Sequence, residues 1–311
     1  MAYDVGKQVG SYDPKETMGV IEKIAKQVIP SVTADDRLSE LEKGTLENGT
    51  TLEQVVVGLA EPGVYTDTYD GTDATDPFKA LDPNLVVRYF DEWTSRQYSA
   101  KVSNQKFRKI MLSGGSAGQI AEMVVASLME GENQTNYETV RNMFKKDSTV
   151  TNVMPIAKQV LEADQLTNPA NVEKKVKEIL LAIRNAVSGM TFVNTTYNAA
   201  ALKRKTNKED IMVIMPYEFY NLVDVEVLAG IFNIDKLEVQ NRVILIDAPI
   251  SGDFDICIFD KNAVQIYTRL KELTSEFNAK TLEQNYFYTV EKMYAFSPLF
   301  DACRVSVQYG A

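Results

Sequence analysis

Residues 46–99 constrain the fold of this chain more than any other stretch, because about fifty residues pass there without a helical pattern. Two segments, TTLEQVVVGLAEPGVYTDTY and PNLVVRYFDEWTSRQYSAKVS, are rich in β-branched and aromatic residues and are interrupted by glycine and proline. This pattern predicts a long two-stranded β-ribbon over 46–99. An isolated ribbon is barely stable in water, and its free edges promote aggregation. We therefore expect the ribbon to lie on another surface, which is the first indication of assembly.

The predicted ribbon contains an acidic segment, DTYDGTDATD at residues 67–76, which raises the question of a calcium site. An EF-hand loop requires glycine at its sixth position and a closing glutamate. In this segment the glycine stands at another position and the glutamate is missing, so the EF-hand pattern fails. We interpret 67–76 as the tip of a loop, with calcium binding as the minor alternative.

Within the first 190 residues, four segments carry apolar residues at the spacing of an amphipathic helix. The first, ETMGVIEKIAKQVIPSV, ends at Pro30. The second begins at Ser116, and we expect it to stop at Gly131. The third, NYETVRNMFKKD, is short, and the fourth covers 169–189.

The third quarter of the chain has the pattern of an α/β module. Short continuous apolar runs, typical of strands buried on both faces, occupy 211–215, 243–246 and 256–259. Between the first two lies PYEFYNLVDVEVLAGIF, with Phe219 and Leu222 on the apolar face of a predicted helix. The C-terminal segment LEQNYFYTVEKMYAFSPLFDACRVSV alternates and is rich in aromatic residues. We expect it to form a long strand that returns to pair with earlier elements.

Residues 114–118, GGSAG, match the G-x-S-x-G nucleophile elbow of serine hydrolases. A Ser-His-acid triad requires a histidine, and the chain contains none. A Ser-Lys pair of the S-x-x-K type is also missing, because Gln119 stands at the lysine position. Ser116 and Gln119 instead form a capping box, in which two side chains satisfy backbone donors at a helix start. We predict that Ser116 caps a helix, with a histidine-free hydrolase using Ser116 or Asp247 as the distant alternative.

Two acids and two cysteines are further candidates for chemistry. Asp247 and Asp260 directly follow predicted strands, where α/β enzymes often keep acids. Asp247 is the first residue of DAP and Asp260 the first residue of DKN, and both tripeptides favour turns. Cys257 and Cys303 have no C-x-x-C spacing, and Cys257 lies inside the apolar run ICIF, so we interpret it as a core residue.

The basic run Lys203-Arg204-Lys205, followed by Lys208, is short and is typical of a solvated loop rather than of an anion-binding site. The chain contains neither G-x-G-x-x-G nor a P-loop motif. We therefore predict no catalytic, cofactor-binding or metal-binding residues and no cofactor.

The overall composition narrows the possible partners. A formal net charge of −10 disfavours extended nucleic-acid binding by the chain as a whole. No apolar run approaches the roughly 20 residues needed to cross a bilayer. The first 20 residues lack the apolar region of a secretory signal, so we expect an intracellular protein with reduced cysteines and no membrane partner.

The order of these elements resembles the major capsid proteins of tailed bacteriophages, which have the Hong-Kong-97-type fold. The likeness is greatest in two C-terminal segments, EDIMVIMPYEFYNLVDVEVLAGIFNIDKLEVQNRVILIDAP and AVQIYTRLKELTSEFNAKTLEQNYFYTVEKMYAFSPLFDACRV. These are similar to the shell proteins of short-tailed phages. The resemblance covers most of the chain and lies in the order of the elements and the general character of the sequence. This family has no single diagnostic motif.

The resemblance implies an α+β fold in five parts. These are an N-terminal arm and helix (1–45), a β-ribbon called the E-loop (46–99), a peripheral domain with the spine helix (100–150), an apical α/β domain (151–270) and a return to the peripheral domain (271–311).

The resemblance also implies a structural protein without catalytic residues, assembled in bacterial cytoplasm and present in the virion capsid. Its copies would form hexamers and pentamers that close an icosahedral head around double-stranded DNA. Scaffolding, portal or decoration proteins are implied as partners, as is packaged DNA on the inner face without sequence specificity. Some members of the family crosslink a lysine to an asparagine, but no such pair is assigned in this chain. The alternative is the shell protein of an encapsulin-like bacterial nanocompartment.

Overall fold

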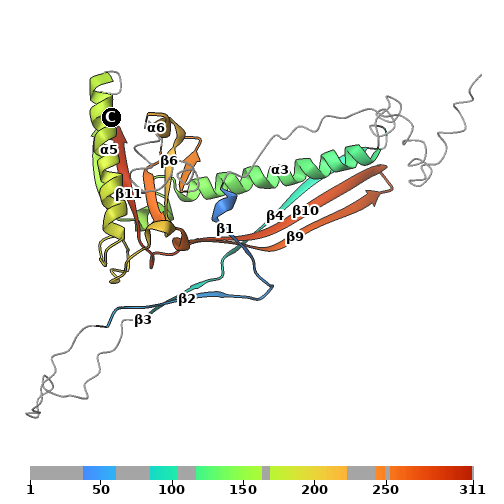
Figure 1. The fold of residues 1–311 in the computed structure, drawn as a ribbon. Coiled ribbons are helices and arrows are strands. Elements are labelled where there is room, and N and C mark those ends of the chain that lie inside the picture. Colours follow the sequence, from blue (N-terminus) through green and yellow to red (C-terminus); the bar gives the residue numbers. More distant parts are fainter. Residues whose placement is uncertain are drawn as a thin grey trace, which may run out of the picture. The chain divides into compact units, whose positions relative to one another are not determined.

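The computed structural model describes residues 38–60, 85–103, 105, 117–162, 169–222, 242–248 and 253–309 (Figure 1). They belong to two compact units. The first unit contains the described parts of Thr94–Tyr137 and Thr268–Lys292. The second contains the described parts of Arg37–Trp93, Glu138–Tyr267 and Met293–Ala311.

The second unit contains a five-stranded mixed sheet with the strand order β5-β11-β8-β6-β7. Strand β8 is antiparallel to both β11 and β6, whereas β11 is parallel to β5 and β6 is parallel to β7. The strands predicted at 211–215, 243–246 and 256–259 are confirmed. The bounds of the five strands are β5 Ile156–Glu162, β6 Ile211–Pro216, β7 Val243–Ile246, β8 Ile256–Asp260 and β11 Ala302–Tyr309.

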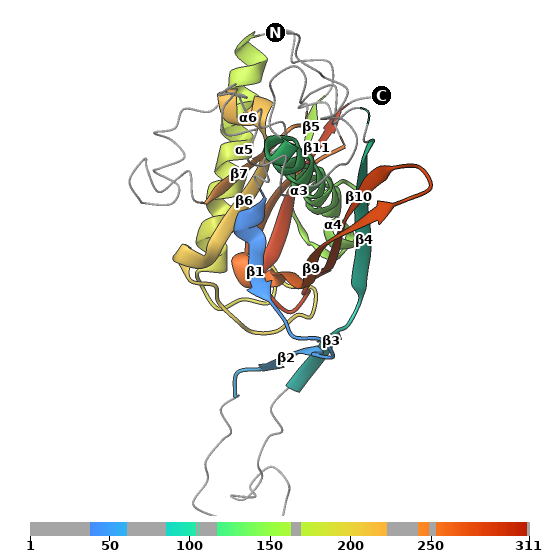
Figure 2. The same cartoon turned by 90° about the vertical axis from the view of Figure 1, so that its right-hand side faces the viewer.

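Helix α5 (Pro169–Met190) packs against one face of this sheet (Figures 1 and 2). Alternate residues of β6, β8 and β11 join its apolar stripe in a single core cluster, which includes Ile183, Val213, Ile258 and Val305. On the other face Phe259 stacks against Phe144, with ring centroids 5.2 Å apart. The sheet is therefore buried on both faces, as the continuous apolar runs predict.

The predicted fourth helix is confirmed as α5, and Gly189 in its last turn has a packing role. A Cβ atom at this position would lie 2.5 Å from the hydroxyl oxygen of Tyr197. Glycine therefore allows the loop after the helix to approach closely. Helix α6 (Tyr217–Leu222) begins directly after β6, and Phe219 is buried as predicted. The side chain of Leu222 and residues 223–241 lie outside the described residues.

The C-terminal segment forms two strands, β10 (Glu283–Phe296) and β11, so the expectation of one long strand is wrong. The expected return of 271–311 to the peripheral domain stays a prediction. Strand β11 lies between β5 and β8 in the five-stranded sheet. It takes this place because Cys303, Val305 and Val307 complete the core cluster under α5. The expectation that the chain end pairs with earlier elements is confirmed, since β5 precedes β11 by more than a hundred residues.

The first unit is built from a long helix and three long strands. Strand β4 (Trp93–Ser103) belongs with β1 (Glu42–Thr45), β9 (Val264–Asn278) and β10 (Glu283–Phe296) to a sheet of order β1-β9-β10-β4. Strand β1, the parts of β9 and β10 beyond 268–292 and the end of α3 after Tyr137 belong to the second unit. In the first unit, Leu128 of α3 (Ala117–Met143) packs with Tyr288 and Val290 of β10, and Tyr98 of β4 lies against this cluster.

The expected end of the second helix at Gly131 is wrong, because α3 continues to Met143 and absorbs most of the predicted third helix. Glycine inside a helix costs about 1 kcal/mol, but packing of the next turns outweighs this. Residues four apart along one side of α3 are buried on both sides of the glycine: Leu128, Glu132, Asn136 and Val140. Two of the four are polar, which is why the apolar pattern seemed to stop. Glu132 is accommodated by Lys292, whose Nζ lies 2.6 Å from its Oε1.

The predicted ribbon is observed as the antiparallel pair β2 (Leu52–Val57) and β3 (Leu85–Phe90) (Figure 1). The ribbon ends earlier in the chain than predicted, because residues 93–99 belong to β4 of the four-stranded sheet. The acidic segment 67–76 lies outside the described residues, as do the helix expected before Pro30 and the cap residue Ser116. The described residues also form short elements: η1 Ser39–Leu41, α4 Thr149–Val153, η2 Lys208–Asp210 and η3 Lys261–Ala263.

Candidate functional site

One face of the β2–β3 ribbon is apolar and open to solvent. Cross-strand partners share a face of a two-stranded sheet, and Val55 pairs with Val87 while Val57 pairs with Leu85. Tyr89 lies on the same face, opposite Glu53. The exposed fractions are 51% for Val55, 56% for Val57, 58% for Leu85, 37% for Val87 and 63% for Tyr89. We call these five residues the open ribbon face.

The opposite face of the ribbon is attached to its own unit. Leu52 and Val56 are half-buried, and Phe90 is buried. The hydroxyl of Ser297 donates a hydrogen bond to the side-chain oxygen of Gln54. The guanidinium of Arg88 lies 5.4 Å from the centre of the Phe90 ring. One face of the ribbon thus contacts its own unit. The other face is apolar, and no described residue covers it.

A hollow of about 370 Å³ lies at the base of the ribbon. The ribbon contributes Arg88–Phe90 to its wall, and Asp91 and Glu92 follow. The remaining walls come from α4, the end of α3 and the end of β10, with lining residues Met143, Thr149, Val150, Val153, Met293, Tyr294, Ala295, Phe296 and Pro298. The lining of the hollow is mixed, because apolar side chains such as Met143, Val150 and Phe296 lie beside the charged Arg88, Asp91 and Glu92.

The acids expected in turns are held by hydrogen bonds and ion pairs. Asp260 caps η3, where its carboxylate accepts the backbone N–H of Asn262 at 2.8 Å. Asp247 follows β7 and accepts from Arg141 at 2.8 Å, with its side chain 61% exposed. Ser116 lies outside the described residues, so its role as a helix cap stays a prediction.

The basic run does not form one patch, because its middle residue points into the protein. Arg204 donates to Asp260 at 3.3 Å, and its guanidinium lies 4.1 Å from the centre of the Phe300 ring. Lys203 and Lys205 on either side are exposed. The alternation follows from local strand geometry, since Arg204 forms an isolated β-bridge with Asn194.

Arg204 belongs to a buried polar network that the sequence did not reveal. Asp301 is fully buried and accepts from the hydroxyl of Thr206 at 2.9 Å and from the amide of Asn198 at 3.2 Å. Burial raises the pKa of both Asp260 and Asp301, and the charge of Arg204 opposes both rises. Hydrogen bonds from Asn262 also oppose the rise at Asp260, as do those from Thr206 and Asn198 at Asp301. The network joins the loop after α5 to the ends of β8 and β11. No signal in the sequence links residues so far apart.

The cysteines have the surroundings of core residues. Cys257 and Cys303 are both buried and free, and burial raises the pKa of both thiols far above the ordinary value. In the part of the chain that the structure describes, no three acidic, cysteine or histidine side chains gather closely enough to hold a metal ion. Among the same residues, no helix is both long and apolar enough to cross a membrane.

Comparison with known proteins relates the chain to phage major capsid proteins. The family described as Phi29-like phage major capsid protein matches residues 17–306. The major capsid protein of Bacillus phage GA-1 is 24% identical over 290 residues, covering 91% of this chain and 58% of that protein. The major capsid protein of Streptococcus phage Cp-1 is 25% identical over 235 residues, covering 73% of this chain and 62% of that protein. The chain thus spans about three fifths of the length of these curated relatives.

Solved structures show the same fold. The capsid structure of Staphylococcus phage Andhra matches with a TM-score of 0.69 and 13% identity, covering 92% of this chain and 88% of that one. The capsid structure of cyanophage P-SCSP1u matches with a TM-score of 0.54 and 11% identity, covering 94% and 95%. The chain therefore has a phage capsid-like fold of mixed α and β structure.

Proposed function

Because the chain belongs to the family of Phi29-like phage major capsid proteins, we propose that its copies assemble into the head shell of a tailed bacteriophage. The observation that carries this proposal beyond the family is the open ribbon face. Five large apolar side chains are exposed on a narrow ribbon whose other face already packs against its own unit. Fully burying one such side chain stabilises a contact by about 1.5–3 kcal/mol. Repeated over a closed symmetric shell, such contacts give cooperative stability without one strong site.

We further propose that the arrangement is of the Hong-Kong-97 type. In this assignment β2 and β3 form the base of the E-loop, α3 is the spine helix, and the five-stranded sheet with α5 is the apical layer. The division of the chain at 45, 99, 150 and 270 belongs to the same proposal. It is refined at two places: we propose that 93–99 belong with β4 and its sheet, and that β11 belongs with the apical layer, because β11 lies in the five-stranded sheet.

The shell function defines the partners that we propose. Other copies of the chain, in hexamers and pentamers, are the first partner, and the virion capsid is the location. Packaged double-stranded DNA and scaffolding, portal or decoration proteins follow from the same function. The phage-specific family favours a phage head over an encapsulin-like compartment and over a hydrolase using Ser116.

The open ribbon face can be tested without disturbing the fold. Replacing Val55, Val57 and Val87 by threonine keeps the β-branched shape and adds a hydroxyl to each exposed side chain. We expect the concentration at which closed particles form to rise by about tenfold or more, since about 1.4 kcal/mol corresponds to a factor of ten. Light scattering and negative-stain microscopy of the purified chain measure this concentration.

The matched control replaces the same three residues by isoleucine, which keeps the face apolar, and should assemble like the parent chain. Thermal unfolding of the unassembled threonine variant should be close to that of the parent, because the three side chains are already 37–56% exposed before assembly. Normal particle formation by the threonine variant would contradict the role of the ribbon face. A parent chain that stays monomeric under every condition tested would contradict the shell function.

A further inference from the structure

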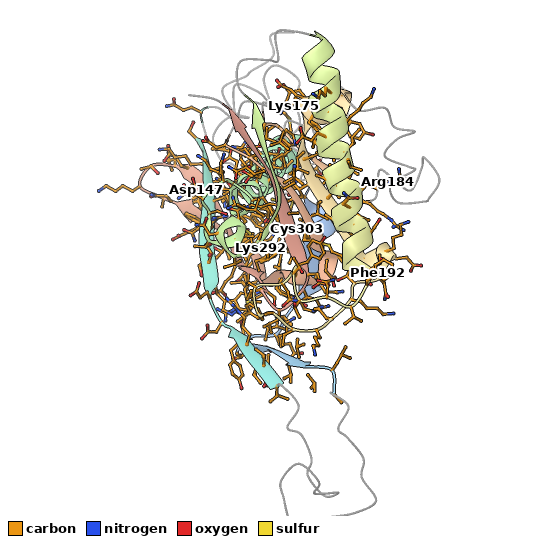
Figure 3. The ribbon with its side chains drawn as sticks, turned by 90° about the vertical axis from the view of Figure 1, so that its left-hand side faces the viewer. Asp147, Lys175, Arg184, Phe192, Lys292 and Cys303 are labelled. Carbon is orange, nitrogen blue, oxygen red and sulfur yellow. The ribbon has the colours of Figure 1, made fainter. Side chains whose placement is uncertain are left out.

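The loop that follows α5, residues 191–206, returns to the end of the helix that it leaves. The backbone N–H of Thr206 donates to the carbonyl of Met190 at 2.8 Å, and this bond closes the loop. Near its start, Phe192 is 72% exposed and Val193 is 54% exposed. Figure 3 shows Phe192 just beyond the C-terminal end of α5. Compact surface loops with close ends are frequently functional, and this one presents an aromatic side chain to solvent.

Two asparagine side chains fix the path of the loop. Asn194 accepts the backbone N–H of Thr196 at 3.1 Å. Asn198 accepts the backbone N–H of Leu202 at 2.7 Å and donates to the carbonyl of the same residue at 2.8 Å. The amide nitrogen of Asn198 also donates to Asp301 at 3.2 Å. Because Asp301 directly precedes β11, this last bond attaches the loop to the five-stranded sheet.

One hydroxyl group lies between two buried carboxyl groups where the loop meets the sheet. The Oγ1 atom of Thr206 is 2.9 Å from Asp301 Oδ2 and 3.3 Å from Asp260 Oδ2. All three residues have 2% or less of their surface exposed. The other oxygen of each carboxyl group already accepts a hydrogen bond, from Asn262 at Asp260 and from Asn198 at Asp301. The two Oδ2 atoms therefore depend on what surrounds Thr206.

The three oxygens are one hydrogen short if both carboxyl groups are ionised. A hydroxyl carries a single hydrogen, so Thr206 can donate to only one of the two Oδ2 atoms at a time. The other Oδ2 atom would then face the lone pairs of the hydroxyl with no hydrogen between them. A proton on either carboxyl group supplies the missing hydrogen.

The charges at this site are also unbalanced. Arg204 Nη2 donates to Asp260 Oδ2 at 3.3 Å, whereas Arg204 Nε is 3.8 Å from Asp301 Oδ2, which is too long for a hydrogen bond. One guanidinium thus faces two carboxyl groups. A second negative charge without a partner is costly in a buried site.

The other titratable groups near the pair leave this imbalance in place. Lys261 of η3 is about half exposed and pairs with Asp210 at 2.6 Å, and the charge of Asp210 adds to that of the acids. Lys43 of β1 lies at the surface, where desolvation lowers its pKa and the charge of Asp260 raises it. Charges in contact with water compensate a buried carboxylate only weakly. Cys303 stays neutral, because burial raises the pKa of its thiol far above the ordinary value.

We propose that Asp260 and Asp301 share one proton through the hydroxyl of Thr206, and that loss of this proton with rising pH releases loop 191–206 from the sheet. The proton belongs to the pair rather than to one acid. It makes the group of two carboxyls and Arg204 neutral. When the loop opens, the carboxylates become hydrated and the proton passes to water. This device lies within the second unit and is independent of the proposed shell assembly.

The direction of the pH dependence follows from proton linkage. Burial raises the pKa of both Asp260 and Asp301 while the loop is closed. In the open loop an exposed aspartate has its ordinary pKa of about 3.9. Between this value and the higher value of the closed loop, opening releases one proton. The population of the open loop therefore rises by up to about tenfold per pH unit in this range.

Hydrogen exchange of the full chain measures the opening. The reporters are the backbone N–H groups of Thr206 and Arg204, the second of which donates to Asn194 at 3.2 Å. We expect their protection, corrected for the intrinsic pH dependence of exchange, to fall by up to about tenfold per pH unit above about pH 4. The N–H of Val213 in the centre of the sheet should keep its protection over the same range. Loop protection that does not change with pH would overturn the proposal.

Two variants separate the shared proton from a general loss of stability. Asp301→Asn keeps the shape of the side chain, and its NH2 group supplies the missing hydrogen to Thr206, so loop protection should become independent of pH. Thr206→Val keeps the shape and removes the bridge, so protection should be lower by about fivefold or more even at about pH 5. Thr196→Val is the matched control at an exposed position of the same loop, and it should keep the parent's pH profile. An unchanged pH profile in Asp301→Asn would contradict the shared proton.

Infrared spectroscopy detects the proton in the parent chain itself. At about pH 6 exposed aspartate and glutamate side chains are ionised, since their ordinary pKa values are about 3.9 and 4.3. The parent should still show the band of a protonated carboxyl group, and this band should be weaker in Asp301→Asn. A parent spectrum without the band would overturn the proposal even if a variant failed to fold.

Discussion

Strand β6 and the β2–β3 ribbon use similar residues for opposite purposes. The β6 residues Ile211, Val213 and Met215 are fully buried between sheet neighbours and α5. The ribbon residues Val55, Val57 and Leu85 are more than half exposed. Both segments have high β-propensity, so propensity alone does not separate them. The difference shows that a run of β-branched residues forms a core where the same chain provides both covering layers, and forms a candidate interface where it provides one.

The largest effect that would sharpen this contrast comes from deletion of residues 64–80. We expect the five-stranded sheet to stay folded, because its strands β5, β11, β8, β6 and β7 all lie outside the deleted segment. We expect closed particles to disappear, because the proposed E-loop loses its tip. Circular dichroism and negative-stain microscopy of the same sample measure the two properties. Closed particles of normal size from the shortened chain would show that the E-loop assignment is wrong.

Truncation of one aromatic residue in each region should give unequal losses of stability. Phe219→Ala removes a side chain that is 3% exposed in the core cluster, and we expect it to lower the free energy of unfolding by about 3–5 kcal/mol. Tyr89→Ala removes a side chain that is 63% exposed, and we expect a change below about 0.5 kcal/mol in the unassembled chain. Urea unfolding measures both. Equal losses would mean that the ribbon is packed against its own unit in solution.

A smaller effect concerns the polar end of the sheet, which has no counterpart in the ribbon. Burial raises the pKa of Asp301, so the folded chain holds this proton more tightly than the unfolded chain does. Ionisation of Asp301 therefore lowers stability as the pH rises from the unfolded value of about 3.9 through the higher folded pKa. Asp301→Asn removes this term, and each full pKa unit corresponds to about 1.4 kcal/mol.

We therefore expect the stability of the asparagine variant, relative to the parent, to improve as the pH rises from about 4 towards 7. Urea unfolding at a series of pH values provides the measurement. The control is Asp253→Asn, whose carboxylate is exposed and pairs with Lys145 at 3.1 Å. A relative stability that falls with rising pH would mean that Arg204 and Thr206 outweigh burial at this site.

Parts of the fold could be predicted because the relevant signal is local. Strands β6, β7 and β8 are continuous apolar runs, and α5 has a complete stripe with a proline at its start. The end of α3 could not be predicted in this way. Its buried side includes Glu132, whose burial depends on Lys292, far away in the sequence. A helix pattern read from apolar residues alone misses such a pair.

The candidate site divides in the same way. The ribbon and its need for a partner surface could be predicted, because fifty residues of strand and turn cannot bury enough apolar surface to form a core of their own. The face that remains open could not be predicted, since it depends on the register that pairs Val55 with Val87. The inward direction of Arg204 was missed for the same kind of reason. Its acids, Asp260 and Asp301, approach it only when β8 and β11 pair.

Composition and local pattern were sufficient for three properties of this chain: the lack of histidine, an α/β module in the third quarter, and a two-stranded β-ribbon in the first third. These properties depend on residue type and on neighbours within a few positions. The three-dimensional structure decided which valines are core and which are surface, where β11 belongs, and which charges are neutralised internally. Those outcomes depend on contacts between residues separated by tens to hundreds of positions, where no local preference acts.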